Sequence, residues 1–573
     1  MGNRGVRSGL AFAAAAAALL GGLPAAASAA TFTVTVAGDT TGTTCAAPSC
    51  SLRQAIGAAN LSSGADTIVF SGVTSISPTL ALPPITGRTT ISAAPPVAID
   101  GGVAGAGADG LSFSGFGASN SVIEGVAISH FTRDGIRISG ATAVTVRSSR
   151  IGTDPAGATG FGNAGNGISL LNGASTAQIG VGFAFPLGNT IVGNLGDAIH
   201  ADATSGSATI VGNSIGFDPQ VPAANGNGGD AIDLASPSNV IGGIGTGEGN
   251  VIANSAGAGV RITGAGASAN RLQGNFVGVT SFDALAGNAG RGVLIDGAPG
   301  NHIGGSGAGE GNTISGNGRD GIEIVSGASG NDVDGNRIGT NTAGDRLRPN
   351  DGNGVSVNSS PNTTIGGSVS GAGNLISGNL GNGIDVENTP SANTVIQGNR
   401  IGTNAAGTAA LPNVSGIAAE STTLVGGANP GEGNLISGNL DTGIILGNVG
   451  PGRVQGNLVG TNATGAGAVP NGAEGIDIDQ PGASVGGPGS AGNTSPSTSA
   501  QASESGRRAS LWRRTRCSPM AALASTSIRS ASRPTIPATP TPVGRTSPTS
   551  ALRSPLAVPR SCAAPSRRPP VAR

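Results

Sequence analysis

The sequence predicts an all-β protein, a right-handed parallel β-helix solenoid with an N-terminal cap. The first observation is a recurring segment in which a glycine or alanine precedes two apolar residues that flank a variable one, as in Gly383-Ile384-Asp385-Val386. The second is its spacing of 27 to 33 residues, because self-similarity at a fixed period is the signature of a solenoid. The segment begins at positions 135, 167, 198, 231, 259, 292, 321, 354, 383, 416, 443 and 475.

The third observation is the alternation of the apolar residues, Ile384 with Val386 and Ile322 with Ile324. This period of two is typical of strands and excludes helical repeats. Leucine-rich repeats need leucines at several fixed positions, whereas this interior is mostly isoleucine and valine. A parallel β-helix remains, whose turns (here called rungs) stack about 4.8 Å apart and cross over with a right hand.

Gly-Asn pairs recur along the same repeat. Asparagine tolerates the left-handed backbone of a sharp corner, and stacked amides can hydrogen-bond from rung to rung, so a structural role is predicted for these residues. One set falls at the same point of every second rung, and a second set falls in the intervening rungs. The first set is Asn213, Asn275, Asn336, Asn399 and Asn457, and the second is Asn254, Asn317, Asn379 and Asn439.

In chain order, residues 1–29 read as an export signal. Arg4 and Arg7 give a positive start, positions 10 to 23 are apolar, and Ala27-Ser28-Ala29 resembles a cleavage site. The apolar run is too short for a membrane span of about 20 residues. We therefore expect a secreted or cell-surface protein without a transmembrane segment.

Residues 30–134 are expected to form the cap and the opening rungs, ahead of the repetitive β-helix at 135–493. Cys45 and Cys50 are close enough in an exported chain to form a disulfide. Ser51 and Gln54 match a capping box, which predicts a short helix near residues 51 to 60. A solenoid needs such a cap because its first rung would otherwise expose an unpaired edge.

The segment Cys50-Ser51-Leu52-Arg53-Gln54-Ala55 resembles the N-terminal Cys-Ser-Leu-Arg-Glu-Ala (CSLREA-type) motif of a family of bacterial secreted right-handed β-helix proteins, with Gln54 in place of glutamate. Residues 64–70 and 82–85 are similar to the opening rungs of that family. The resemblance covers about residues 31 to 493 and extends, more distantly, to chlamydial polymorphic outer-membrane proteins and pectate-lyase-like folds. It implies the architecture and a cell-surface or secreted location, and it supplies no catalytic motif.

The predicted solenoid is acidic. Residues 30–493 hold 15 arginines and 30 acidic residues, a net charge of −15. Such a surface repels phosphate backbones and anionic lipids, which argues against nucleic acid or a membrane surface as partner.

No metal or cofactor is predicted, although calcium on the loops is an alternative. Glu248, Glu310 and Glu432 end Gly-Glu-Gly-Asn loops in every second rung, which places them about 9.6 Å apart. One calcium ion with ligands at about 2.3–2.6 Å cannot use two of them.

The variable position between the paired apolar residues should point outward and stack into a row. His200, Asp233 and Arg261 occupy three successive rungs of it. A histidine oriented by a carboxylate beside a fixed cation suits acid-base chemistry on an acidic sugar polymer, and these three are the candidate catalytic residues. The alternative is a solvated face with one cross-strand ion pair.

Other catalytic signals are missing from the sequence. Aromatic residues make up 2% of the chain, no paired aspartates occur, and the single tryptophan is Trp512. The predicted function is therefore that of an exported cell-surface or extracellular structural protein, adhesin-like, with an unknown surface ligand or polysaccharide as partner and no identifiable catalytic site. The alternative is a pectate-lyase-like polysaccharide lyase or a glycoside hydrolase.

Residues 494–573 break the pattern. They hold 13 arginines against one acidic residue, Glu504, and are rich in proline and serine, which predicts a disordered tail. A sharper hypothesis is a one-nucleotide deletion near codon 494, because shifting the frame lets residues 524–528 be read as Gly-Ile-Asp-Leu-Asp, the rung motif. Cys517 and Cys562 would then carry no function, and the natural C-terminal cap would be missing.

Overall fold

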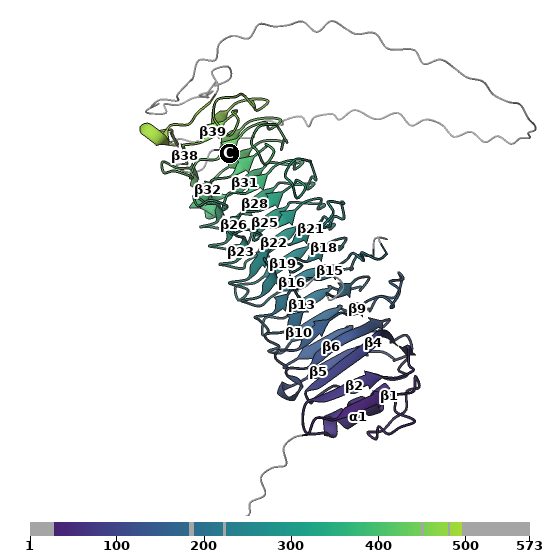
Figure 1. The fold of residues 1–573 in the computed structure, drawn as a ribbon. Coiled ribbons are helices and arrows are strands. Elements are labelled where there is room, and N and C mark those ends of the chain that lie inside the picture. Colours follow the sequence, from purple (N-terminus) through teal and green to yellow (C-terminus); the bar gives the residue numbers. More distant parts are fainter. Residues whose placement is uncertain (1–27, 183–187, 222–224, 448–451, 480–481, 496–573) are drawn as a thin grey trace, which may run out of the picture. The chain divides into compact units, whose positions relative to one another are not determined.

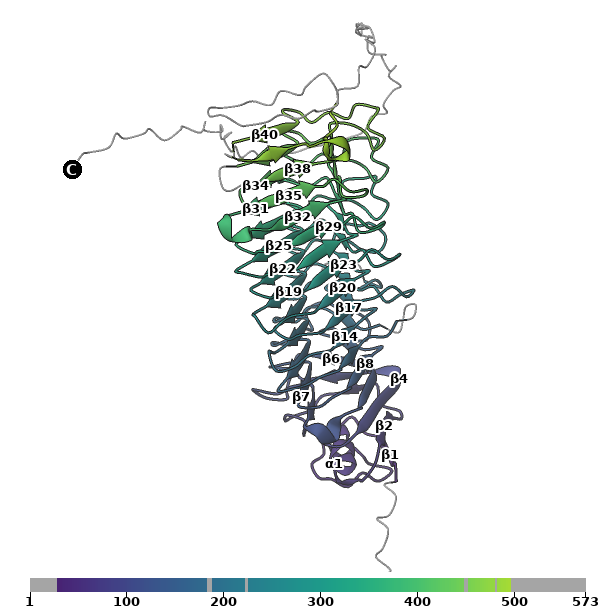
Figure 2. The ribbon, with the colours of Figure 1, turned by 90° about the vertical axis from the view of Figure 1, so that its left-hand side faces the viewer.

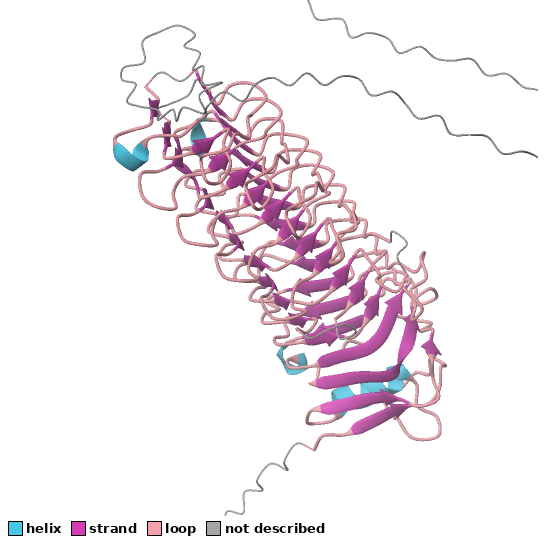
Figure 3. Cartoon of the chain, turned by 45° about the horizontal axis from the view of Figure 1, so that its top comes forward, coloured by secondary structure: helices cyan, strands magenta, loops and turns pink. Residues whose placement is uncertain are grey.

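The computed structural model describes residues 28–182, 188–221, 225–447, 452–479 and 482–495. Nearly all of the predicted export signal and of the predicted tail lies outside these residues. The regular secondary structure of the described chain is almost entirely β-strand, joined by loops and turns, with one α-helix, α1 (Leu52–Leu61), and three short 3-10 turns, η1 (Phe116–Ala118), η2 (Thr389–Ser391) and η3 (Gly489–Ala491) (Figure 3). The predicted fold class, all-β with a parallel β-helix, is confirmed.

One face of the solenoid is a 13-stranded sheet in which each strand pairs in parallel with the strand one rung away (Figure 1). Twelve of its strands match the predicted rungs, and β5 precedes them. The strands are β5 (Leu111–Ser114), β7 (Ile136–Ser139), β10 (Ile168–Leu171), β13 (Ile199–Ala201), β16 (Ile232–Leu234), β19 (Val260–Thr263), β22 (Val293–Asp296), β25 (Ile322–Val325), β28 (Val355–Asn358), β31 (Ile384–Glu387), β34 (Ile417–Ala419), β37 (Ile444–Leu446) and β40 (Ile476–Ile478).

The other two faces belong to a forked sheet of 28 strands. Its long strands β4 and β6 serve both branches, because β6 pairs with β8 through one half and with β9 through the other. The first branch is β1 (Thr31–Val34), β2 (Asp66–Phe70), β4 (Thr89–Asp100), β6 (Val122–Ser129), β8 (Thr145–Arg147), β11 (Gln178–Ile179), β14 (Thr209–Ile210), β17 (Val240–Gly242), β20 (Arg271–Gln273), β23 (His302–Gly304), β26 (Asp332–Asp334), β29 (Thr364–Gly366), β32 (Thr394–Gln397), β35 (Thr423–Gly426), β38 (Arg453–Gln455) and β41 (Ser484–Val485).

The second branch continues from the same two long strands. It consists of β3 (Ser75–Ile76), β9 (Arg150–Ile151), β12 (Thr190–Ile191), β15 (Ser214–Ile215), β18 (Val251–Ile252), β21 (Phe276–Val277), β24 (Thr313–Ile314), β27 (Arg337–Ile338), β30 (Leu375–Ile376), β33 (Arg400–Ile401), β36 (Leu435–Ile436) and β39 (Leu458–Val459). One rung therefore contributes three strands, for example β25, β26 and β27, and the next rung begins with β28 beside β25. Figure 2 shows the strands β19 and β22 of the 13-stranded sheet beside β20 and β23 of the first branch.

The core lies between the three faces and is filled by the alternating residues of the strands. Ile322 and Ile324 of β25 are fully buried, whereas Glu323 between them is turned outward and partly exposed. Each such isoleucine contributes about 1.5–3 kcal/mol to stability through burial of its side chain. The strand register depends on this pattern, since a slip by one residue would exchange the buried and exposed sets.

The cap helix is confirmed. Ser51 and Gln54 form the predicted capping box at the start of α1, and Cys45 and Cys50 form a disulfide. The guanidinium of Arg53 binds both carboxylate oxygens of Asp39, at 2.7 and 2.8 Å. Since α1 buries its apolar face against β1 and β2, it covers the first rung.

Rung-to-rung stacking of asparagine amides is also confirmed. Along one corner, each side-chain Nδ2 donates to the Oδ1 of the next asparagine at 2.9–3.0 Å. These residues are Asn213, Asn250, Asn275, Asn312 and Asn336. The ladder thus has one member in every rung, because the Gly-Glu-Gly-Asn loops supply the intervening ones.

Two parts of the asparagine prediction are wrong. In the first set, the left-handed residue of the corner is the preceding glycine, with φ of 67° at Gly274 and 69° at Gly335, whereas Asn275 and Asn336 have no positive φ. In the second set, Asn254 does adopt the predicted left-handed backbone, with φ of 52°. The second set also lies elsewhere. Asn317, Asn379 and Asn439 belong to a separate ladder at another corner, and Asn254 stands outside both, with its Nδ2 bound to the carbonyl of Gly216.

Candidate functional site

Two columns of mostly polar side chains follow the outer face of the 13-stranded sheet. The strand column is the predicted outward row, and its register is confirmed by the pairing of the strands: Ser112, Arg137, Ser169, His200, Asp233, Arg261, Leu294, Glu323, Ser356, Asp385, Ala418, Ile445 and Asp477. The corner column lies three residues earlier in each rung: Asp109, Asp134, Asn166, Asp197, Asp230, Ala258, Arg291, Asp320, Asn353, Asn382, Ser415, Thr442 and Glu474.

The corner column carries a ladder of its own. In most rungs the side-chain Oδ1 of one member accepts the backbone N–H of the next member, at 2.7 Å from Asp230 to Asp197 and at 2.6 Å from Ala258 to Asp230. Asn353 does the same for Asn382, at 2.8 Å. These aspartates therefore have a structural task that an asparagine can also perform.

His200 and Asp233 are brought together as predicted. The Nδ1 of His200 lies 2.9 Å from Asp233 Oδ2 and 3.7 Å from Asp197 Oδ2. The hydrogen bond to Asp233 raises the pKa of His200 above its usual value. Burial, together with the neighbouring charges of Asp233 and Asp230, raises the pKa of Asp197 to about 6. The His200 side chain is 27% exposed.

Arg261 does not complete that group. It is in register with Asp233, but its Nη1 lies 3.8 Å from Asp230 Oδ2, one column away. Sequence reasoning missed Asp197 and Asp230, although both stand three residues before a member of the predicted row. A corner separates these aspartates from the strand. Side chains in a corner do not alternate with the period of two that holds in a strand, so the sequence did not show that Asp197 and Asp230 face the same side as His200.

Asp197, His200 and Asp233 also have the spacing of a metal-ligand cluster. One ligand atom each from Asp197, His200 and Asp233 lies within 4.8 Å of the others. However, Asp197 Oδ1 already accepts the N–H of Asp230, and His200 Nδ1 is engaged with Asp233. These two potential ligand atoms already have hydrogen-bond partners within the protein, so we assign no metal here.

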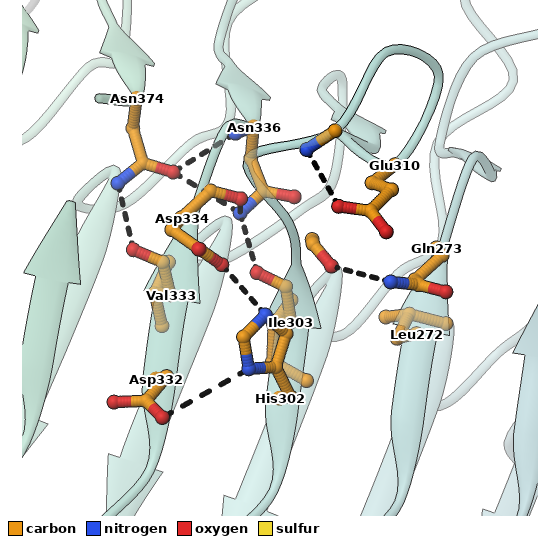
Figure 4. Close-up of polar contacts among 12 residues, drawn as sticks. Leu272, Gln273, His302, Ile303, Glu310, Asp332, Val333, Asp334, Asn336 and Asn374 are labelled. Carbon is orange, nitrogen blue, oxygen red and sulfur yellow. Dashed lines mark hydrogen bonds and ion pairs between the residues drawn. The ribbon is translucent and has the colours of Figure 1, made fainter. Parts of the chain in front are cut away.

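The other two histidines show what an ordinary cross-rung pair looks like. His302, on β23 of the first branch, has its Nε2 2.9 Å from Asp334 Oδ1 and its Nδ1 3.8 Å from Asp332 Oδ2 (Figure 4). The hydrogen bond to Asp334 raises the pKa of His302. His130 uses both ring nitrogens too, toward Asp100 at 2.9 Å and the carbonyl of Gly160 at 3.1 Å.

His200 differs from both. Its Nδ1 is held by carboxylates, but its Nε2 has no partner among the residues that the structure describes. A ring nitrogen of this kind can exchange a proton with a bound molecule.

The loop glutamates have a local task. The carboxylate of Glu248 accepts the N–H of Gly245 at 2.8 Å, and Glu310 and Glu432 repeat this contact in their own loops. This closure of each loop on itself gives a structural reason for the recurrence of the glutamates.

No protein-family model and no curated protein matches the chain. Similar solved structures include the A-module of the Azotobacter vinelandii mannuronan C-5 epimerase AlgE6 (TM-score 0.39, 14% identity, 76% of this chain and 92% of that chain). The AlgE4 A-module of the same organism has a TM-score of 0.36, with 14% identity over 76% and 90% of the two chains. The Dettilon tailspike protein has a TM-score of 0.30, with 16% identity over 72% and 62%. No helix in the described ranges is long and apolar enough to cross a membrane.

Proposed function

We propose that this chain is an exported cell-surface or extracellular β-helix protein, adhesin-like, that binds an extended polysaccharide on its 13-stranded sheet. The observation that carries the proposal is the unbroken register of the strand column, from β5 to β40. It offers side chains, most of them polar, at a repeat of about 4.8 Å, and a polymer of repeating units can contact several of them at once.

The rigidity of the frame supports this proposal. Several side-chain ladders and a fully buried core fix the columns in place, as at Asn336 and Ile322. Binding to such a surface costs little ordering entropy in the protein, because the groups are already positioned.

A second candidate function is a polysaccharide lyase or glycoside hydrolase. It is favoured by one observation, the unpartnered Nε2 of His200 among the described residues, with Nδ1 held by Asp233 at 2.9 Å. A histidine fixed in this way can act as a general acid or base.

The two functions are separated by one set of assays on the full chain. The protein is incubated with acidic and neutral polysaccharides, and both binding and the release of new reducing ends or unsaturated products are measured. We expect binding without product. The matched variants are His200→Ala and His302→Ala, since His302 is a carboxylate-paired histidine on another face and both its ring nitrogens are engaged.

Product that is formed by the wild type and by His302→Ala, but is lost in His200→Ala, would assign the enzyme. Binding to none of the polysaccharides would contradict the proposed function itself.

A further inference from the structure

Both columns lose their carboxylates over the rungs of β19 and β22, and regain them in the rung of β25 with Asp320 and Glu323. In the corner column, Ala258 and then Arg291 replace the usual aspartate or asparagine. In the strand column, Arg261 is followed by Leu294. Carboxylates are thus replaced by small, apolar and basic side chains in the middle of an acidic solenoid.

This change leaves a shallow depression of about 290 Å³ on the face of the sheet. It is lined by small residues such as Ala258 and Gly290, by three arginines, Arg261, Arg291 and Arg319, and by one carboxylate, that of Asp230. Three of the 15 arginines between residues 30 and 493 therefore meet at one place.

The corner ladder is broken at the depression. The Asp230 carboxylate accepts the N–H of Ala258 at 2.6 Å. Ala258 has no side-chain oxygen that could accept the N–H of Arg291 in the next rung. The guanidinium of Arg291 has no acceptor atom either, so it cannot accept the N–H of Asp320. Within the described ranges, the backbone N–H groups of Arg291 and Asp320 accordingly find no acceptor. Both lie where neighbouring rungs place a carboxylate or amide oxygen.

The arginines around this break have donors to spare. Arg319 is exposed and forms no ion pair with any described residue. Arg261 reaches Asp230 only at 3.8 Å. Arg291 is held by Glu323 through Nε and through its Nη2, which lies 3.2 Å from Oε1. A planar guanidinium matches a carboxylate or sulfate group through two parallel hydrogen bonds.

We propose that Arg261, Arg291 and Arg319, with the free N–H groups of Arg291 and Asp320, form an oxyanion-binding site for the carboxylate or sulfate group of an acidic glycan. The ligand oxygen takes the place that a corner-column carboxylate fills in other rungs, and Leu294 contacts the sugar ring. The site rests on the proposed function, since it lies on the same sheet, and it narrows the ligand to anionic sugars. Its nearest arginine, Arg261, lies two rungs, or about 10 Å, from the rung of His200.

The test is calorimetric titration of the full chain with three hexasaccharides: a uronic acid oligomer, a sulfated oligomer and a neutral one. We expect one or both acidic oligomers to bind and the neutral one to bind weakly. Arg319→Ala should weaken acidic binding about tenfold through the loss of charge-assisted hydrogen bonds. Binding of only the uronic acid oligomer identifies a carboxylate site, and binding of only the sulfated oligomer identifies a sulfate site.

Ala258→Asp is the sharper variant. It restores the residue type found at Asp230 and Asp320 in the same column, so it should supply the N–H of Arg291 with an internal acceptor. We expect the melting temperature to stay the same or rise while acidic binding is lost. Arg400→Ala is the matched control, because Arg400 is an exposed arginine of the second branch, and it should bind as the wild type does.

Acidic binding that is unchanged in both Arg319→Ala and Ala258→Asp would overturn the site and leave the proposed function standing. Equal binding of the neutral oligomer would also overturn it. Failure of the wild type to bind any of the three would contradict the site and the proposed function together.

Discussion

At the scale of single residues, Asp197 performs two tasks. Its Oδ1 accepts the N–H of Asp230, and its Oδ2 faces His200. Asn166 and Asn353 perform the first task in other rungs without a charge. The charge of Asp197 is therefore unnecessary for the ladder, and burial raises the pKa of its carboxyl to about 6.

Asp197→Asn should stabilise the protein near neutral pH. The pKa of this carboxyl rises on folding from 3.8 to about 6, so the native state binds the proton more tightly than the unfolded state does. The resulting stabilisation is fully present below pH 3.8 and is lost as the pH rises through about 6. The asparagine amide still offers an Oδ1 to the N–H of Asp230, and because it does not ionise, it avoids the loss of stability at higher pH. We expect a gain of about 1 kcal/mol at pH 7.5, after allowance for solvent screening, and none at pH 3.5. Thermal unfolding at both pH values measures it, and a lower melting temperature at pH 7.5 contradicts the account.

His302 should titrate above the usual histidine pKa, because Asp334 hydrogen-bonds to the protonated ring. Protonation of this histidine then stabilises the fold below the unfolded-state pKa, and the stabilisation is lost as the pH rises through the folded-state value. The chain has only three histidines, so selectively labelled NMR resolves them. Asp334→Asn should lower the His302 pKa. A His302 resonance that does not respond to this substitution would refute the assigned cause.

At the scale of elements, the sequence was sufficient for twelve of the thirteen strands of the 13-stranded sheet, all but β5, because the segment around Ile384 sets both the register and the direction of each side chain. It was insufficient for the corners. Gly-Asn occurs at more than two places in the rung, so Asn275 and Asn317 look equivalent in sequence although they belong to separate ladders. The corner column, with Asp197 and Arg291, was missed for the same reason.

Asn336→Ala tests the amide ladder. The Oδ1 of Asn336 accepts two hydrogen bonds from Asn312, and its Nδ2 donates to Ile303 O at 2.7 Å. The substitution leaves buried groups unsatisfied and should cost about 2–4 kcal/mol. The control is Asn404→Ala, because Asn404 hydrogen-bonds only within its own loop. Urea unfolding that gives the same loss for both variants would argue against a stabilising ladder.

Ile322→Asp and Glu323→Ala test the in-out pattern on adjacent residues of β25. Ile322 is fully buried, so an aspartate there places an unpaired carboxylate in the core and should cost more than about 4 kcal/mol. Glu323 is partly exposed and paired with Arg291, so its loss should cost about 1 kcal/mol or less. Chemical unfolding ranks the two, and a reversed order would contradict the assigned strand.

At the scale of the whole solenoid, each rung contacts mainly its neighbours, so stability spreads along the stack and single surface positions remain free to specialise. The 13-stranded sheet shows this division. Its buried residues repeat with little change, whereas the strand column varies from Arg137 to Asp477. Because the buried residues of this sheet repeat while its outward residues vary, we assign the ligand to the outer surface of the 13-stranded sheet.

The most direct test is amide hydrogen exchange across the full chain, with and without a bound acidic hexasaccharide. The account predicts new protection confined to the 13-stranded sheet and its corners from β13 to β25. It should include the N–H groups of Arg291 and Asp320, which should exchange fast in the free protein. Protection that appears instead on the first or second branch, with none on the 13-stranded sheet, would contradict the assignment of the binding face.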